Sequence, residues 1–198
     1  MGYNIMKKTI LFLRHPAPKI PLGFCYGQTD LEIAEPEKLS PSVSEFELIF
    51  SSPLQRCIKA AQILFPKNEI ITDERLKELN FGEWENRKWD DVPKNELDEW
   101  SKNLLSFRPG GSESFQELSE RVNAFLQELL QRKEEKILVL SHAGTMRAAL
   151  SHIMNISLEK TLNFSLGYFH CAEYAFAEPK RRLLFWNLDF HSFLKEKH

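Results

Sequence analysis

The chain has 198 residues, with 26 lysine and arginine residues against 28 aspartate and glutamate residues, and its formal net charge is −2. This length suits one domain, and a chain with 42% hydrophobic residues can bury a sizeable core, which excludes an intrinsically disordered protein. The near balance of charge excludes a protein that attracts nucleic acid through a global basic field. We therefore expect a single domain over residues 1–198 and no nucleic-acid partner.

The first half of the chain predicts two strands and a helix. Thr9–Leu13 and Glu47–Phe50 are apolar runs without polar alternation, which is typical of strands inside a parallel sheet. Directly after the second run, Ser52–Gln55 has the spacing of a capping box with proline at the first helical position. We therefore expect a helix that begins at Pro53. Its apolar residues recur every three to four positions and predict one buried face: Leu54, Cys57, Ile58, Ala61, Leu64 and Phe65.

The middle of the chain predicts an insertion, two further helices and a third strand. The polar segment from Asn86 to Pro109, with three of the four tryptophans at or beside it, predicts an irregular or weakly helical insertion over the edge of the sheet. A second capping box, Ser114–Glu117, opens a helix with an apolar stripe. Lys136–Leu140 predicts a third buried strand, and we expect a helix from Gly144 to about Met154.

The C-terminal part predicts a hairpin. His170–Ala177 and Arg182–Trp186 flank the polar turn Glu178–Arg181, a pattern that indicates two antiparallel strands at the sheet edge. The alternation of strands and helices predicts an α/β fold, with three α/β/α layers, a mostly parallel central sheet and a C-terminal edge hairpin. Two roles stay open for the hairpin and its phenylalanine-rich tail: pairing with a second copy in a homodimer, or closing the core. The tail residues are Phe185, Phe190 and Phe193.

The cysteines and the apolar runs bear on the compartment. An odd number of cysteines without a C-x-x-C motif is typical of reduced thiols in a cytoplasmic protein; they are Cys25, Cys57 and Cys171. The apolar stretch Ile10–Leu13 ends at Arg14 and is too short for the core of a signal peptide. No run approaches the roughly 18 apolar residues of a transmembrane helix, so we expect a cytoplasmic protein without a membrane partner.

Basic side chains and histidines follow three of the predicted strands. Arg14 and His15 end the first strand, Arg56 lies one turn into the helix after the second, and His142 follows the third. Because ligands of open α/β sheets bind at the carboxyl ends of the strands, we expect these side chains to share one crevice, where helix starts at Pro53 and Gly144 add N–H donors. Arginine forks match phosphate oxygens and a neutral imidazole can attack phosphorus, so the pattern predicts a site for phosphate.

Each of these residues has an ordinary interpretation when taken alone. An Arg-His pair can be a solvated loop, Arg56 a surface residue paired with a carboxylate, and His142 a core histidine. Their shared position at three strand ends favours a common site. No two histidines or cysteines have the spacing of known zinc ligands, so we expect no metal.

Four segments resemble the signatures of the histidine phosphatase (phosphoglycerate mutase-like) superfamily: Leu13–Pro16, Ser51–Arg56, Arg75–Glu85 and Ser141–Gly144. Within it, Gly23–Asp30, Phe81–Glu85 and Gly110–Ser114 resemble the alpha-ribazole phosphatase branch. The resemblance implies a cofactor-free phosphomonoester hydrolase for a small phosphorylated metabolite, alpha-ribazole 5′-phosphate in cobalamin nucleotide-loop assembly. The alternatives are a broad-specificity small-metabolite phosphatase, a protein phosphohistidine phosphatase and a catalytically silent anion-binding module.

The resemblance also implies residue roles. His15 resembles the nucleophile that becomes phosphohistidine, and Arg14, Arg56 and His142 match the groups that bind the transferring phosphoryl oxygens. Glu78 matches the proton donor to the leaving oxygen. Its nearby competitors are Glu83 and Glu85. Substrate or phosphate contacts are further implied for Tyr26, Gly27, Gln28 and Gly144.

Two departures and one substrate feature complete the sequence picture. Pro16 stands where most relatives have glycine, and Ser112 interrupts the glycine pair that usually precedes the Glu-Ser dipeptide. An aromatic wall is expected around a nucleoside-like leaving group, formed by Phe24, Tyr26, Phe81, Trp84 and Trp89. Arg108 and Glu113 are expected at its rim, while the competing interpretation places the aromatic residues in the core.

Overall fold

The computed structural model describes residues 8–42, 45–177 and 179–196. It contains one six-stranded sheet in the order β3-β2-β4-β1-β5-β6. The strands are β1 (Lys8–Arg14), β2 (Leu48–Ser51), β3 (Ile70–Thr72), β4 (Lys136–Ser141), β5 (His170–Ala177) and β6 (Lys180–Asp189). The α-helices are α1 (Gln55–Leu64), α2 (Lys94–Lys102), α3 (Phe115–Leu130), α4 (Ala143–Met154) and α5 (Phe190–Glu196).

The sheet is parallel through four strands and antiparallel at one edge. β3, β2, β4 and β1 pair in parallel, whereas β5 pairs antiparallel with β1 and β6 antiparallel with β5. The expected mostly parallel sheet with a C-terminal edge hairpin is therefore confirmed. Glu178, in the predicted turn of that hairpin, lies outside the described residues.

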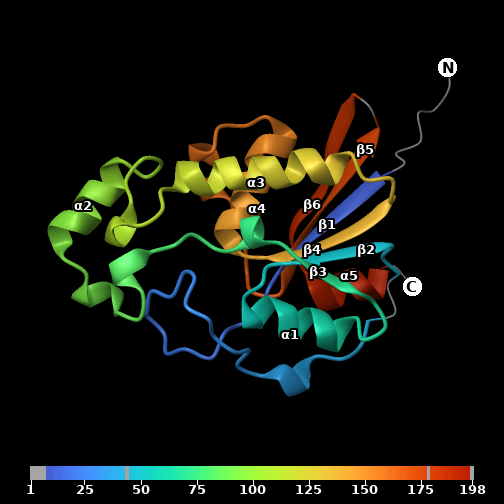
Figure 1. Ribbon diagram of the computed structural model, residues 1–198, viewed down its shortest axis with the longest axis horizontal. Helices are drawn as coiled ribbons and strands as arrows, with labels where there is room; N and C mark the ends of the chain where they lie inside the picture. The colour runs from blue at the N-terminus through green and yellow to red at the C-terminus, as the bar shows by residue number, and fades with distance from the viewer. Residues whose placement is uncertain (1–7, 43–44, 178, 197–198) are drawn as a thin grey trace.

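Both faces of the sheet are covered, as the uninterrupted apolar strands require. Along β1, Ile10 and Phe12 pack into the core under α3 and α4, and Leu11 and Leu13 pack into the core under α1 and α5. Figure 1 shows α3 and α4 on one side of the sheet and α1 and α5 on the other. The three-layer α/β/α architecture follows from this alternation, because successive side chains of a strand point to opposite faces.

The phenylalanine-rich tail belongs to the core of its own chain. Phe190 and Phe193 are buried, with their rings stacked at a centroid distance of 5.7 Å. Phe185, on β6, contacts Phe193 at 5.7 Å. Of the two roles left open by the sequence, closure of the core accounts for these side chains, and homodimer formation stays a prediction.

The first helix begins later than its capping pattern indicates. Leu54 is extended (φ −69°, ψ 137°) and α1 starts at Gln55, so the prediction of a helix from Pro53 was wrong. The hydroxyl of Ser52 lies 2.7 Å from His142 Nε2 instead of capping the helix. The N–H of Gln55 donates to Asp30 Oδ1 at 2.7 Å, so the loop after β1 provides the cap.

The second capping box is confirmed. Ser114 Oγ accepts from the Glu117 N–H at 3.2 Å, and Glu117 Oε2 accepts from the Ser114 N–H at 2.9 Å. This pair starts α3, whose buried stripe of Leu118, Val122 and Phe125 packs over the sheet. The strand β3 had no prediction from the sequence, because three residues are too few for a recognisable pattern.

The predicted insertion forms a small core of its own beyond the carboxyl ends of the parallel strands (Figure 1). We call it the tryptophan cluster, and it comprises Phe81, Trp84, Trp89, Trp100 and Phe107. Trp84 is 1% exposed and its ring centroid lies 5.5 Å from that of Trp100, which stacks on Trp89 at 5.9 Å. The helix α2 therefore packs on this cluster.

The structure shows two of the features that bear on the compartment, the cysteines and the helices. The three cysteines are free and buried. No helix in the described ranges is long and apolar enough to cross a membrane. The residues before Lys8, which the targeting interpretation also covers, lie outside the described residues.

Candidate active site

The carboxyl ends of β1, β2 and β4 lie side by side. The backbone hydrogen bonds between these strands continue for one residue beyond them. Arg14 pairs with Ser141 and Ser51 with Leu140. The His15 N–H then donates to Ser141 O at 3.0 Å, and the Ser52 N–H donates to Leu140 O at 2.9 Å. This register places His15, Ser52 and His142 together at one edge of the sheet, which is the convergence that the sequence predicts.

His15 is held in one tautomer. Its Nδ1 lies 2.6 Å from Pro16 O, and because a carbonyl oxygen only accepts, Nδ1 carries the proton. The lone pair is then on Nε2, which Arg56 Nε approaches at 3.3 Å. Burial lowers the pKa of His15 well below its usual 6.5, and the charges of Arg56 and Arg14 lower it further. These effects favour the neutral imidazole, with its lone pair on Nε2.

The two arginines differ in how their donors are used. Arg56 is fully buried, and it donates to Thr29 O at 2.9 Å and to Gly27 O at 2.6 Å, so the loop after β1 fixes it. Arg14 donates to Leu166 O at 2.6 Å and lies 3.9 Å over the ring of Tyr168. Arg14 Nε is buried without a hydrogen-bond partner among the described residues.

His142 completes the basic cluster. Its ring centroid lies 5.0 Å from that of His15, and Nε2 contacts Ser52 Oγ at 2.7 Å. Burial lowers its pKa well below 6.5, and the charge of Arg56 lowers it further. Its Nδ1 is buried and has no hydrogen-bond partner within the described ranges. Unpartnered buried polar atoms are rare in folded proteins, so this one and Arg14 Nε mark a place for a polar ligand.

The carboxylate of Glu78 lies against the start of α4. Its carboxylate accepts from the Gly144 N–H, at 3.1 Å to Oε1 and 3.2 Å to Oε2, and from the Leu79 N–H at 2.9 Å. A Cβ at residue 144 would meet the same carboxylate, which would have to shift to make room. The structure therefore gives the Gly144 N–H to Glu78, whereas the sequence assigned Gly144 to the substrate or its phosphate.

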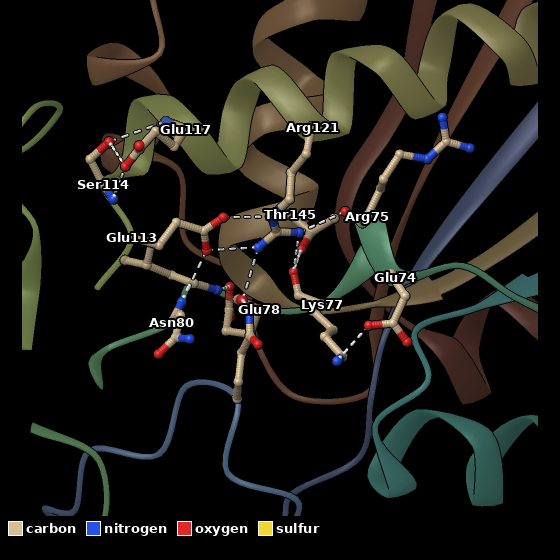
Figure 2. Close-up of polar contacts among 12 residues, drawn as sticks. Glu74, Arg75, Lys77, Glu78, Asn80, Glu113, Ser114, Glu117, Arg121 and Thr145 are labelled. Carbon is tan, nitrogen blue, oxygen red and sulfur yellow. Dashed lines mark hydrogen bonds and ion pairs between the residues drawn. The ribbon is translucent and has the colours of Figure 1, made fainter. Parts of the chain in front are cut away.

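Arg121 on α3 clamps the segment that carries Glu78 (Figure 2). It donates to three backbone carbonyls, those of Arg75 at 2.6 Å, Lys77 at 2.7 Å and Glu78 at 2.9 Å. It also pairs with both carboxylate oxygens of Glu113, at 2.6 and 2.9 Å. All three guanidinium nitrogens are thus engaged, and the backbone of residues 75–78 is fixed to a rigid helix.

The loop after β1 contributes the remaining predicted residues. Gln28 Nε2 donates to Glu78 O at 2.9 Å, and Tyr26 Oη lies 2.5 Å from Tyr168 Oη. Gly27 has a positive φ of 29°, and a Cβ there would lie 2.5 Å from Leu79 O. The loop thus packs against both Glu78 and the basic cluster.

The two competitors of Glu78 have other positions. Glu85 accepts from the N–H groups of Gln28 at 2.8 Å, Thr29 at 2.5 Å and Phe81 at 3.0 Å, and from the Thr29 hydroxyl at 2.5 Å. Its carboxylate thus organises the loop after β1. Glu83 is exposed. Glu78 is the carboxylate that lies against the start of α4.

A cavity of about 240 Å³ adjoins Glu78. Its lining comes from the tryptophan cluster, α4 and nearby loops: Glu78, Leu79, Phe81, Trp100, Leu104, Phe115, Ala143, Gly144, Arg147 and Leu162. Most of these side chains are apolar, and the charged ones are Glu78 and Arg147.

The expected aromatic wall is only partly present. Phe81 belongs to the tryptophan cluster and lines the cavity, whereas Trp84 and Trp89 belong to the cluster but are not among the lining residues. The expected rim residues are engaged elsewhere, since Arg108 forms an ion pair with Glu117 and Glu113 is held by Arg121. The core interpretation was correct for the two tryptophans, because aromatic type alone does not separate a wall from a core.

Tyr168, Arg121 and Arg147 were missed by the sequence analysis. Tyr168 contacts Arg14 and its ring centroid lies 5.6 Å from that of His15, but it stands in a loop before β5 with no motif around it. Arg121 follows the second capping box by one turn. Arg147 lies one helical turn after Gly144, so its helical spacing was the available signal.

No group of three or more His, Cys, Asp or Glu side chains among the described residues is arranged to hold a metal ion. The basic cluster of Arg14, His15, Arg56 and His142 instead concentrates positive charge and hydrogen-bond donors on one spot. Such a set stabilises the oxygens of a phosphoryl group during transfer.

A model of the histidine phosphatase superfamily (branch 1) matches residues 10–189. That span contains all the site residues described above, and the chain belongs to the histidine phosphatase superfamily. It is accordingly a phosphatase, that is, a phosphoric monoester hydrolase. The superfamily resemblance noted in the sequence is confirmed.

The names of known proteins similar to the chain refer to different substrates. A relative from Hydrogenobacter thermophilus, which bears the provisional name phosphoserine phosphatase 2, is 27% identical over 177 residues, 87% of this chain and 84% of the relative. The adenosylcobalamin/alpha-ribazole phosphatase of Escherichia coli K12 is 26% identical over 125 residues, 60% of this chain and 62% of that protein.

Two crystal structures share the fold. The alpha-ribazole phosphatase from Shigella flexneri has a TM-score of 0.80 and 21% identity, over 90% of this chain and 96% of that chain. A mutant phosphoserine phosphatase from Entamoeba histolytica, in complex with phosphoserine, has a TM-score of 0.78 and 21% identity, over 93% of this chain and 98% of that chain. At this identity the two structures show the fold alone.

Proposed function

We propose that the chain hydrolyses small phosphomonoesters through a phosphohistidine at His15. His15 Nε2 attacks phosphorus, an N–P bond forms and the P–O bond to the leaving group breaks. Arg14, Arg56 and His142 stabilise the negative charge on the other phosphoryl oxygens during this step. The observation that supports the proposal best is the neutral imidazole whose Nε2 faces Arg56 Nε at 3.3 Å and whose pKa the charges of Arg56 and Arg14 lower.

Glu78 provides the proton for the leaving oxygen, because it is the carboxyl group beside the cavity and its orientation is fixed by the Gly144 N–H. In the second step a water attacks the phosphohistidine and gives its proton to the Glu78 carboxylate. The N–P bond breaks, orthophosphate is released, and Glu78 is protonated again for the next turnover. No proton is gained or lost by the enzyme over the cycle.

Replacement of the nucleophile tests this mechanism. We expect His15→Ala to abolish hydrolysis of p-nitrophenyl phosphate, and we expect wild-type protein quenched during turnover to show an acid-labile phosphate adduct in its intact mass. The matched control is His191→Ala, an exposed histidine on α5. Retained turnover in His15→Ala would contradict the assignment of the nucleophile.

Alpha-ribazole 5′-phosphate is one candidate substrate. Its support is the resemblance of Gly23–Asp30 and Gly110–Ser114 to that branch, together with the relatives named for this activity. The apolar lining of the cavity suits a flat aromatic base. Cobalamin nucleotide-loop assembly would be the corresponding process.

A broader set of small phosphorylated metabolites is the second candidate. A cavity of about 240 Å³ with only two charged lining side chains gives few contacts that would reject one small leaving group in favour of another. His15 is 1% exposed, which favours small phosphomonoesters over phosphohistidine on a protein surface. Comparing kcat/KM across a metabolite panel that includes alpha-ribazole 5′-phosphate separates the two candidates: a single strong preference supports the first, and similar values support the second.

A further inference from the structure

Buried polar atoms without partners concentrate around the active site. Five buried side-chain nitrogen or oxygen atoms of the described residues lack a hydrogen-bond partner, and they include Arg14 Nε, His142 Nδ1 and Arg147 Nε. The first two belong to the basic cluster that is arranged for phosphate. The third has the same property but belongs to a side chain that lines the cavity together with Glu78. Such atoms indicate where a ligand supplies the missing partner.

Arg147 differs from the arginines that hold the fold together. Its one hydrogen bond goes from Nη2 to Phe164 O at 3.2 Å. It forms no ion pair with any carboxylate in the part of the chain that the structure describes. Arg121, by contrast, donates five hydrogen bonds and is paired with Glu113. Arg147 thus faces the cavity with its charge and most of its donors unused.

The electrostatic environment agrees with this geometry. Burial lowers the pKa of the Arg147 guanidinium, and Arg14 lowers it further, whereas Glu78 is the carboxylate that opposes them. When Glu78 is protonated to serve as the acid, that compensation is lost. A partly buried cation without an ion-pair partner gains from an anion nearby, so an anion bound in the cavity would stabilise Arg147.

We infer that Arg147 binds a second anionic group, a carboxylate or a phosphate, on the leaving group of the substrate. The inference rests on the proposed function, because Glu78 protonates the leaving oxygen and the cavity beside Glu78 must therefore hold the rest of the leaving group. An arginine fork matches a carboxylate with two parallel hydrogen bonds. The leaving group of alpha-ribazole 5′-phosphate has no second anionic group, so this subsite favours the second candidate above and, within it, small phosphorylated acids.

A pair of substrates that differ in one group tests the subsite. 3-Phosphoglycerate and glycerol 3-phosphate differ by a carboxylate in place of a hydroxymethyl group. We expect wild-type protein to prefer the carboxylate, and Arg147→Met to lower kcat/KM for 3-phosphoglycerate by about 10- to 100-fold, as a charge-assisted hydrogen bond would. Turnover of glycerol 3-phosphate should change by less than about threefold. Arg147→Lys keeps the charge but loses the fork, so its kcat/KM for 3-phosphoglycerate should lie between those of the wild type and Arg147→Met.

The controls separate the subsite from folding and from the chemical step. Arg182→Met, an exposed position on β6, should leave both substrates unchanged. Equal loss on both substrates in Arg147→Met, or no loss on either, would overturn the inference. So would a wild-type protein that does not distinguish the pair. Calorimetric titration of both compounds onto His15→Ala, with and without Arg147→Met, reads the subsite without turnover, so its result is independent of the proposed mechanism.

Discussion

Replacing Arg121 by methionine would keep the aliphatic part of the side chain and remove the clamp on residues 75–78. Three backbone carbonyls would lose a charged donor, and Glu113 would keep only the Asn80 N–H at 3.1 Å. The side chains of Arg121 and Glu113 are 19% and 17% exposed, so solvent compensates only part of the loss. Breaking a buried ion pair costs about 3–5 kcal/mol, and partial exposure brings our expectation to about 3 kcal/mol of unfolding free energy.

The same change should affect catalysis in a way that identifies the acid. Glu78 O is one of the three clamped carbonyls, so its carboxyl group loses a fixed position, and a displacement of about 1 Å costs roughly 100-fold in rate. We expect this loss in kcat for alkyl phosphates, whose leaving oxygen needs a proton. For p-nitrophenyl phosphate, whose leaving group is stable as an anion, we expect a loss below about fivefold.

Steady-state kinetics over a series of aryl and alkyl phosphates measures the effect as the slope of log kcat against the pKa of the leaving group. Arg121→Met should steepen this slope, and urea denaturation should report the loss of stability. Arg132→Met, an exposed arginine just after α3, is the matched control and should change neither quantity. An equal loss of kcat across the series would refute the idea that Arg121 positions Glu78, and would leave it a structural residue only.

Three further changes test the same site. Glu78→Gln removes the acid and should lower kcat about 100-fold or more for alkyl phosphates and less for p-nitrophenyl phosphate; equal losses would remove Glu78 as the proton donor. Gly144→Ala places a Cβ against the Glu78 carboxylate and should lower kcat about 10-fold; unchanged kcat would show that this contact is not needed. Because the fold lowers the pKa of His15 and His142 well below 6.5, the unfolded chain binds more protons below that pH, so the free energy of unfolding falls as pH drops from 6.5 toward the folded-state pKa values. Urea midpoints at pH 7.5 and 5.5 measure this, His15→Asn should weaken the dependence, and the same dependence in that variant would contradict the assignment.

The convergence of the basic cluster was predictable because it depends only on which residues follow the parallel strands at their carboxyl ends. Ile10–Leu13 and Ile137–Leu140 are apolar at every position, so they had to lie inside a sheet covered on both faces. Once those strands are parallel, the residues that follow them meet at the same edge. His15 and His142 therefore come together through local pattern and topology alone, without any knowledge of loop structure.

Other parts of the site depend on choices that local pattern does not determine. Ser52 could cap a helix or contact His142, and the tertiary contact prevailed because the histidine is buried beside it. Trp84 could line a cavity or fill a core, and the segment's own packing decided for the core. Tyr168 reaches Arg14 only because the chain returns to the sheet at β5, which nothing in the surrounding residues specifies.

The tryptophan cluster separates the phosphate chemistry of the enzyme from its selectivity for the alcohol portion of the substrate. The residues of the basic cluster follow the parallel strands, whereas Phe81 and Trp100 line the cavity and pack in a small core of their own. Substitutions in the segment from Phe81 to Phe107 can therefore reshape the space for the leaving group while the strand ends keep their register. Selectivity for the alcohol portion can diverge among relatives through this segment, with the phosphate chemistry unchanged.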